Sequence, residues 1–487
     1  MSHRLHVEST TKPAERLAAA RLDADAYARD LEIRSSLAVA VRKDLIGIVT
    51  SSVRGVIDTT GARGARIVVA LSGGVDSVVL LHCLTRLAPA LDLHLSALHV
   101  HHGLSRNADA WAQFCEQLCS QLGVSCSVVR VQVDRRHRLG LEAAAREARY
   151  AHFRAQQADA IALAHHRDDQ AETLLLQLLR GAGVRGLSAM PPARALDASG
   201  LLRVLRPMLD VTRSQILAYA REAELAWVED ESNADPTMDR NFLRLQLMPL
   251  LLQRFPGAVE TLCRTAQNAA DASALLDELG ALDARSGVTQ TGLEVEALSE
   301  LSEPRARNLL RWFLEREGVP LPGRERLAEA FHQIVHARHD ARVEVRLGPA
   351  ALRRHRGRVY IEAIKHDTPS DWSCAWHGET RIALPDGLGT MQFEQAVGAG
   401  LSMQRLRDRP TVIRPRTGGE RMRLVQGRPS RTLKNLLQET GMPHWRRDSL
   451  PLMFCADDLV WVPGVGIDCR YAAQPGEAAV VPQWLPA

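Results

Sequence analysis

The chain has 487 residues, 46% of them hydrophobic and 24% charged, with a formal net charge of +4, which describes an ordinary soluble protein of about three domains. No apolar run is long enough to cross a membrane, and the N-terminal segment lacks the apolar core of a signal peptide. The eight cysteines are scattered without a C-x-x-C pair, so a reducing cytoplasm fits better than a disulfide framework.

Residues 1–64 precede the first strand that the sequence predicts. Residues 14–31 are rich in alanine and charge, and residues 36–57 alternate apolar and polar positions at helical spacing. We interpret this region as a helical extension packed on, or lying beside, the first domain. Nothing in it suggests chemistry, so we expect it to be dispensable for catalysis.

Residues 67–84, IVVALSGGVDSVVLLHCL, predict a buried strand, a glycine turn and the start of a helix. This geometry presents free backbone N–H groups to an anion at a helix N-terminus. Gly73 and Gly74 allow a phosphate to approach closely, and the hydroxyls of Ser72 and Ser77 add donors. The loop is not a Walker A motif, because it lacks the terminal Lys. Asp76 beside a polyphosphate makes sense if it holds Mg²⁺ or orients a donor; the alternative is a glycine-rich turn without a ligand.

Strands and helices alternate after this loop. Strands are expected at 93–100, 125–133 and 160–164, and helices at 108–122, 141–156 and from the 165–173 motif through 179. This order predicts an α/β fold with a doubly wound, mostly parallel sheet. Such sheets bind ligands at the carboxyl ends of their strands. The glycine loop, the histidines at 99–102 and the 165–173 motif all fall there, which points to one site.

In HHRDDQAET (165–173), Asp169 and Glu172 lie three residues apart at the start of a helix, so they share a face. Two carboxylates facing one pocket suit a primary ammonium or a metal, and a metal could recruit His165 and His166. The alternative is that acids stand at a helix start because the helix dipole favours them.

Further along, Arg240 and Arg244 open a predicted helix on one face. Two arginines one turn apart can clamp a phosphate or a carboxylate. The alternative is a pair of ion-paired surface arginines.

Beyond the catalytic segment, predicted at 65–249, the pattern becomes helical, and we expect a mostly helical domain at 250–365. A linker or irregular strands follow at 366–410, and a small α+β domain at 411–487. Residues 401–447 hold twelve Lys or Arg against three Asp or Glu, which fits RNA phosphates; the alternative is a solvated basic face. The candidate RNA contacts are Arg414, Arg416, Arg421, Lys434, Trp445 and Arg446.

On these motifs, the chain from about residue 65 onward resembles the tRNA(Ile)-lysidine synthetases. This family belongs to the PP-loop ATP pyrophosphatases, which have an adenine nucleotide alpha hydrolase-like fold. The S-G-G-x-D-S loop alone is shared by many PP-loop enzymes. The combination of HHRDDQAET with DESNADPTMDRNFLR (230–244) is much more specific. Further matching stretches are 99–104, 145–150, 206–209 and 415–445.

The resemblance implies the reaction: ATP adenylates the C2 oxygen of the wobble cytidine of a CAU-anticodon isoleucine tRNA and releases pyrophosphate, and the ε-amine of free L-lysine then attacks C2 and displaces AMP. It implies that the 250–487 half binds tRNA. It also implies that ATP and Mg²⁺ are held by the residues of the glycine loop, Ser72, Gly73, Gly74, Asp76 and Ser77. His165 would lie beside the nucleotide. It further implies that Asp169 and Glu172 bind the lysine, and that Arg146 and Arg240 stabilise charge developing at the α-phosphate or the cytidine oxygen. A homodimer is compatible with the sequence.

The chain departs from the family pattern at three positions, His101, Ser105 and Met238, whose roles are therefore open. Two other functions compete with lysine ligation. A tRNA cytidine thiolation enzyme would share the loop and the adenylation step, but it should carry cysteine pairs. A catalytically silent RNA-binding protein would not need the acids at 76, 169 and 172.

Overall fold

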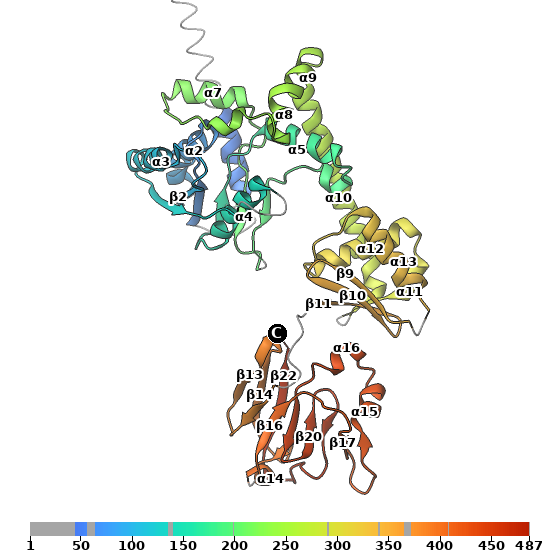
Figure 1. The fold of residues 1–487 in the computed structure, drawn as a ribbon. Helices are drawn as coiled ribbons and strands as arrows, with labels where there is room; N and C mark the ends of the chain where they lie inside the picture. The colour runs from blue at the N-terminus through green and yellow to red at the C-terminus, as the bar shows by residue number, and fades with distance from the viewer. Residues whose placement is uncertain are drawn as a thin grey trace, which may run out of the picture. The chain divides into compact units, whose positions relative to one another are not determined.

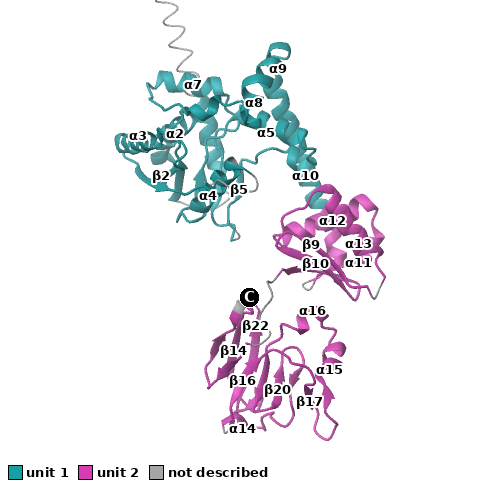
Figure 2. Cartoon of the chain, in the orientation of Figure 1, with its two compact units in different colours: residues 1–279 teal, residues 280–487 magenta. Residues whose placement is uncertain are grey.

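The computed structural model describes residues 44–55, 64–134, 140–197, 199–289, 292–338, 341–364, 372–407 and 409–486. The chain divides into two compact units, residues 1–279 and 280–487 (Figure 2). Most of the predicted extension, residues 1–43 and 56–63, lies outside the described residues. The domain boundaries predicted at 249, 365 and 410 do not coincide with this division, and they stay predictions.

The first unit, coloured from blue to green in Figure 1, is built on a six-stranded sheet with the order β3-β2-β1-β4-β6-β5. All neighbours pair in parallel except β5 and β6, so the expected doubly wound, mostly parallel sheet is confirmed. The short strands β5 and β6 were not expected from the sequence. The strands are β1 (Ala65–Ala70), β2 (Leu93–His101), β3 (Ser125–Arg130), β4 (Ala160–Ala162), β5 (Ala193–Ala195) and β6 (Arg203–Leu205).

Helices connect these strands and continue past the sheet. The 165–173 motif opens a helix as predicted, and the helix that carries Arg240 contains a short π-helical stretch, η2. The elements are α2 (Val75–Leu91), α3 (Ala108–Leu122), α4 (Leu141–Arg154), α5 (Arg167–Leu179), α6 (Val184–Leu187), α7 (Arg213–Glu222), η1 (Glu231–Ala234), α8 (Asp239–Phe242), η2 (Leu243–Leu247), α9 (Met248–Arg254) and α10 (Ala258–Gly287).

The sheet has a hydrophobic core on each face because β1 alternates its side chains. Ile67 and Val69 pack into one core together with α2, α3 and α7. Val68 packs into the other core, which contains Tyr150 and Phe153 from α4. The sheet is therefore covered on both faces, as the continuous apolar run of β1 requires.

A helix at residues 44–55 belongs to the first of these cores. Leu45, Val49 and Val53 are at most 1% exposed and pack with the residues of β1 and α2. This part of the predicted extension is therefore helical and packed on the first domain, and it is part of the hydrophobic core; that the extension is dispensable for catalysis stays a prediction.

We expect Leu45→Ala to lower the free energy of unfolding by roughly 2–5 kcal/mol, since it leaves a cavity in a closely packed core. Urea denaturation followed by circular dichroism measures the change. Ser51→Ala, at an exposed position of the same helix, is the matched control. An unchanged unfolding midpoint for Leu45→Ala would show that the helix is not part of the folded core.

Residues 250–365 are mostly helical, as the sequence predicted, but the first part of the second unit also contains a sheet. A five-stranded sheet with the order β7-β8-β11-β10-β9 packs against three helices around one core. The sequence predicted only two of these strands, because the others are short or lie in a hairpin that turns at Gly348. The elements are β7 (Val288–Thr289), β8 (Gly292–Glu294), α11 (Val295–Glu300), α12 (Glu303–Arg316), α13 (Arg324–His336), β9 (Val343–Leu347), β10 (Ala350–His355) and β11 (Arg358–Ala363).

The rest of the second unit is a β-rich body with a few short helices. Strands from the predicted linker region pair with strands near the C-terminus: β12 joins β16, and β14 pairs with β22 over eight residues. The elements are β12 (Cys374–Trp376), β13 (Arg381–Ala383), η3 (Pro385–Gly387), β14 (Thr390–Val397), β15 (Leu401–Ser402), α14 (Met403–Arg407), β16 (Thr411–Arg414), β17 (Arg421–Met422), β18 (Arg431–Thr432), α15 (Leu433–Glu439), α16 (His444–Arg447), β19 (Leu452–Cys455), β20 (Asp458–Val462), β21 (Gly466–Ile467) and β22 (Ala478–Leu485).

Among the helices in the described ranges, none combines the length and the apolar character needed to span a bilayer.

Candidate active site

The glycine loop between β1 and α2 is held by the side chain of Ser77. Its Oγ accepts hydrogen bonds from the backbone N–H groups of Ser72 and Gly73, each at 3.2 Å, and donates to the carbonyl of Gly74 at 2.9 Å. Ser77 thus shapes the loop from inside, while the first N–H groups of α2 have no partner within the helix. A helix start with free N–H groups is a general binding site for phosphate.

Gly73 is required by both its conformation and its surroundings. Its φ is +89°, and a Cβ at this position would lie 2.8 Å from Cγ2 of Val228 and 3.3 Å from Sγ of Cys115. Gly74 differs, since its φ is −70° and a Cβ there would meet only Oγ of Ser72 at 3.6 Å. The first glycine is therefore fixed by the fold, whereas the second leaves room for a ligand.

Asp76 lies beside the start of α5. Its Oδ2 is 3.4 Å from Nη1 of Arg213, and its Oδ1 is 3.8 Å from Nε2 of His166. Oδ1 is buried without a hydrogen-bond partner among the described residues. Burial raises the pKa of Asp76, although the positive charges of His166 and Arg213 act against it. A buried carboxylate oxygen with an open acceptor site suits a cation.

Asp169 and Glu172 are 8% and 2% exposed and lie together, as the sequence predicted. Arg240 donates from Nε to Glu172 at 2.8 Å and from Nη2 to Asp169 at 2.9 Å. Arg244 donates from Nε and Nη2 to the two oxygens of Glu172, at 2.7 and 3.0 Å, and from Nη2 to Asp169 at 3.0 Å. The two arginines therefore clamp the two carboxylates, which answers the question that the spacing of the arginines left open.

The backbone at the start of α5 adds to this cluster. The N–H of His166 donates to Oδ2 of Asp169 at 3.0 Å, which caps the helix. Burial alone would raise the pKa of Asp169, but the charges of His166 and Arg240 outweigh burial and lower it. Asp169 is therefore an ionised carboxylate at neutral pH.

Asn241, which follows Arg240, explains the spacing between the 231–235 turn and the arginine in the 230–244 stretch. The side-chain amide of Asn241 donates to the carbonyls of Ser232 and Asp235, at 2.9 and 2.8 Å. These bonds hold the 231–235 turn against α8. The position of this turn fixes the residue at which α8 begins. It therefore also fixes the position of the Arg240 guanidinium.

A basic cluster surrounds Tyr150 on α4. Arg146 donates from Nη2 to the Tyr150 hydroxyl at 3.2 Å, and its guanidinium lies 4.7 Å from the ring centroid. Arg194 lies 5.4 Å from the same centroid. Arg206 donates to the carbonyl of Pro191 at 2.7 Å, and burial lowers the pKa of Arg206 to about 10. Arg194 and Arg206 were not among the predicted site residues, although Arg206 opens the 206–209 stretch that resembles the family; their clustering around Tyr150 is what marks them here.

His165, at the carboxyl end of β4, is within electrostatic range of Asp169, Arg206 and Arg240. Its Nδ1 is buried without a hydrogen-bond partner among the described residues. Burial lowers the pKa of His165 to about 3. The neighbouring His166 behaves in the opposite way: burial would lower its pKa, but the carboxylates of Asp168, Asp169 and Asp76 outweigh it and raise the pKa.

These opposite shifts predict an effect of pH on stability. Below pH 6.5 the unfolded chain protonates His165 and the folded chain does not, so this residue makes the protein lose stability as the pH falls toward about 3. His165→Gln should therefore reduce the loss of stability between pH 7 and pH 5, measured by urea denaturation at both values. His166 contributes stability that is full below pH 6.5 and is lost as the pH rises through its raised pKa, so His166→Gln should increase the same acid loss. Equal effects of the two variants would contradict these assignments.

The histidines at 99–102 have mostly structural contacts. Nδ1 of His99 lies 2.9 Å from the carbonyl of Leu71, which ties β2 to the strand before the glycine loop. His101 lies 3.2 Å from Asp109. Ser105, another departure from the family pattern, accepts from the N–H of Asn107 at 3.0 Å, and Met238 is the residue that precedes α8.

The six candidate RNA contacts of the second unit are spread over several elements, and two of them, Trp445 and Arg446, lie on α16. Trp445 and Arg446 both donate to Oε1 of Glu362, at 3.2 and 2.7 Å, and the Trp445 ring packs edge-on against Tyr360. These two residues therefore have partners within the unit. Lys434 is exposed on α15. Arg414 lies over the ring of Phe454, Arg416 is 3.7 Å from Asp448, and Arg421 donates to Ser430.

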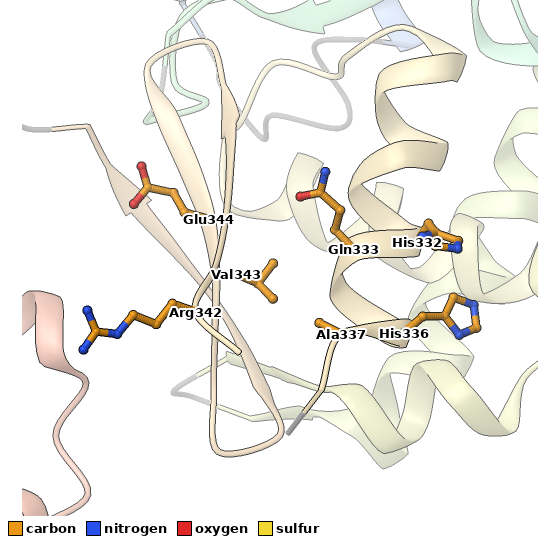
Figure 3. A pocket seen from close by; sticks show the side chains of 7 residues that line it. All are labelled: His332, Gln333, His336, Ala337, Arg342, Val343 and Glu344. Carbon is orange, nitrogen blue, oxygen red and sulfur yellow. The ribbon is translucent and has the colours of Figure 1, made fainter. Parts of the chain in front are cut away.

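An open cavity of about 330 Å³ lies between α13 and β9 in the second unit. Figure 3 shows that its lining side chains come from the end of the helix and the start of the strand. No residue of the predicted site lines it; the lining residues are His332, Gln333, His336, Ala337, Arg342, Val343 and Glu344. The catalytic candidates all belong to the first unit instead.

Comparison with known families gives three matches along the chain. A PP-loop domain matches residues 49–251, a TilS substrate binding domain matches residues 293–360, and a TilS substrate C-terminal domain matches residues 411–484. The first match contains every catalytic candidate, and the third contains all six candidate RNA contacts.

Three relatives match nearly the whole chain, and each is called tRNA(Ile)-lysidine synthase. The protein of Nitrosomonas europaea is 44% identical over 425 residues, which cover 87% of this chain and 92% of that protein. The protein of an Azoarcus species is 42% identical over 427 residues, with coverage of 87% and 92%. The protein of Aromatoleum aromaticum is 44% identical over 422 residues, with coverage of 86% and 97%.

Proposed function

The chain belongs to the tRNA(Ile)-lysidine synthase family, and on that premise we propose that it ligates L-lysine to C2 of the wobble cytidine of a CAU-anticodon isoleucine tRNA. ATP drives the reaction and leaves as AMP and pyrophosphate. The observation that carries the proposal is the pair of buried carboxylates, Asp169 and Glu172, beside the glycine loop. A primary ammonium needs such acceptors, and a phosphate-binding loop needs the free N–H groups of α2.

The first step forms a bond between the cytidine O2 and the α-phosphorus of ATP and breaks the bond to the β-phosphate, which releases pyrophosphate. Ser72, Gly73, Gly74 and Ser77 form the loop that holds the phosphates, with His165 beside the nucleotide. Arg146, from the basic cluster around Tyr150, stabilises the negative charge that develops at the α-phosphate or the cytidine oxygen.

In the second step the ε-nitrogen of lysine attacks C2, and the C2–O2 bond breaks as AMP leaves. Only the neutral amine is a nucleophile, so the ammonium must lose a proton before attack. Asp169 and Glu172 bind the ammonium, and one of them accepts that proton. Arg240 stabilises the departing charge.

Mg²⁺ fits this site through Asp76, whose buried Oδ1 has no hydrogen-bond partner among the described residues. No group of three or more His, Cys, Asp or Glu in the described ranges is arranged to hold a metal. Phosphate oxygens and water would therefore complete the coordination, as is usual for Mg²⁺ bound with ATP. The ion would neutralise the charge of the phosphates.

Substrate recognition is assigned to the second unit, which contains both matched substrate domains. Arg414, Arg416, Arg421 and Lys434 are candidates for phosphate contacts, and Trp445 and Arg446 would have to leave Glu362 to bind RNA directly. All eight cysteines are free, in keeping with a cytoplasmic enzyme. A homodimer is compatible with this reaction but not required by it.

The test is an assay with the purified protein, ATP, Mg²⁺, radiolabelled lysine and unmodified CAU-anticodon isoleucine tRNA. We expect label in this RNA and none in the elongator methionine tRNA, which has the same anticodon. Pyrophosphate release without label would show that adenylation occurs but that lysine is not the nucleophile. A folded protein that gives neither product would contradict the proposal.

The two competing functions are less well supported. A thiolation enzyme would not be expected to match both substrate domains of the lysidine synthase family. A silent RNA-binding protein would have no use for a pair of acids buried next to the phosphate-binding loop.

A further inference from the structure

The carboxylates proposed to bind lysine are already occupied in the folded protein. Oδ1 of Asp169 accepts from both Arg240 and Arg244, and Oδ2 accepts from the N–H of His166. Oε2 of Glu172 also accepts from both arginines, and Oε1 accepts from Arg244. A carboxylate oxygen has two lone pairs, so the two oxygens that face both arginines are saturated.

The charges of this cluster also balance, since His166, which lies 3.5 Å from Asp169, is matched by its other acidic neighbours Asp76 and Asp168. Two guanidiniums face two carboxylates, and both acids are nearly inaccessible to solvent. A lysine ammonium that simply joined the cluster would add an uncompensated positive charge at a buried site, which is strongly unfavourable. Lysine can bind to Asp169 and Glu172 only if one of the two arginines leaves.

We propose that Arg240 is an internal occupant of the lysine site: the lysine ammonium replaces its guanidinium on Asp169 and Glu172, while Arg244 stays and holds both carboxylates in place. This inference rests on the proposed function. The exchange leaves the cluster neutral, with two acids facing one guanidinium and one ammonium. It also frees the guanidinium of Arg240, at the moment lysine binds, for the charge that develops on the nucleotide.

The hydrogen bonds favour Arg240 as the residue that leaves. It makes one hydrogen bond to each carboxylate, through Nε to Glu172 and Nη2 to Asp169. Arg244 makes three hydrogen bonds and grips both oxygens of Glu172 in a fork. Releasing Arg240 therefore breaks fewer bonds and leaves the fork on Glu172 intact.

The backbone that carries the two arginines has an irregular turn. The helix changes at Leu243 to a π-helical stretch, in which the N–H of Met248 bonds to the carbonyl of Leu243. Such stretches are rare and occur often at functional sites. Arg240 lies before it in the four-residue helix α8, and Arg244 lies within it.

The experiment compares Arg240→Gln with Arg244→Gln in the full-length protein. Affinity for L-lysine is measured by calorimetry, and lysine transfer and pyrophosphate release are measured separately. Arg240→Gln should bind lysine roughly tenfold more tightly, because the internal competitor is gone, yet transfer lysine roughly a hundredfold more slowly. Arg244→Gln should bind lysine roughly tenfold or more weakly, because Glu172 loses the fork that orients it. Arg254→Gln, at an exposed position on α9, should change neither quantity.

Tighter binding combined with slower turnover is a result that a merely structural arginine would not give. If either glutamine variant fails to fold, Arg240→Met and Arg244→Met remove the guanidinium and keep most of the apolar length of the side chain, and the same opposite changes in affinity are expected. Weaker lysine binding in the Arg240 variant, or tighter binding only in the Arg244 variant, would overturn the inference. The wild-type protein is assayed first: if it transfers lysine, such results refute the exchange alone, and if it transfers none, the proposed function fails as well.

Discussion

Replacing Asp169 by asparagine should abolish lysine transfer, with a fall of at least about a thousandfold, while pyrophosphate release persists. Asp169 accepts from two guanidiniums and from a backbone N–H, and it is proposed to bind the incoming ammonium. An asparagine side chain has no charge. Its NH₂ group is itself a donor, so it cannot accept the hydrogen bonds that the arginines and the N–H of His166 donate to the carboxylate. The glycine loop is untouched by this change, so the adenylation step should remain.

The same substitution should also destabilise the protein by roughly 3–5 kcal/mol, because it removes one acid from a nearly buried ion-pair cluster and leaves Arg240 and Arg244 to share the carboxylate of Glu172. Urea denaturation separates this loss from the loss of activity. Asp239→Asn is the matched control, since Asp239 is 76% exposed and pairs with Arg180 at the surface, where an ion pair is worth at most about 1 kcal/mol. Full transfer by a folded Asp169→Asn protein would remove this residue from the lysine site.

The second large effect is expected at the glycine loop. Gly73→Ala should destabilise the fold by roughly 1–3 kcal/mol and reduce ATP-dependent pyrophosphate release about a hundredfold or more. An alanine there must keep a φ of +89° with its Cβ 2.8 Å from Val228, so the loop has to shift. A shift breaks the bonds that Ser77 makes to the loop, and with them the position of the phosphate-binding N–H groups.

Gly74→Ala distinguishes backbone strain from loss of space for the ligand. Its φ of −70° suits alanine, and the nearest atom is 3.6 Å from the new Cβ. The thermal midpoint should therefore stay at the wild-type value, while the affinity for ATP falls if a phosphate approaches this position. Equal midpoints for both alanine variants would contradict the account of Gly73.

The catalytic sheet could be predicted because its sequence signals are local. The apolar run of β1, the glycine turn and the helical spacing after it lie within about twenty residues, and the alternation of strands and helices follows the rules for parallel sheets. Asp169 and Glu172 could be placed on one face because three residues nearly complete a helical turn.

The remaining features depend on contacts between distant residues, which one sequence does not reveal. The partners of Asp169 and Glu172 come from a helix about seventy residues later, so the spacing of Arg240 and Arg244 suggested a clamp but not what it holds. The strands β5 to β8 are two or three residues long, too short for a periodic pattern. The helix at 44–55 looked like an appendage because only its packing shows that Leu45 is buried.

The most direct test of the account is a crystal structure of the full-length protein with bound L-lysine. The account predicts that the ε-nitrogen lies about 3 Å from oxygens of Asp169 and Glu172, with Arg244 still on Glu172 and Arg240 turned away. Lysine bound elsewhere, with both arginines still on the carboxylates, would contradict the assignment of this cluster as the lysine site.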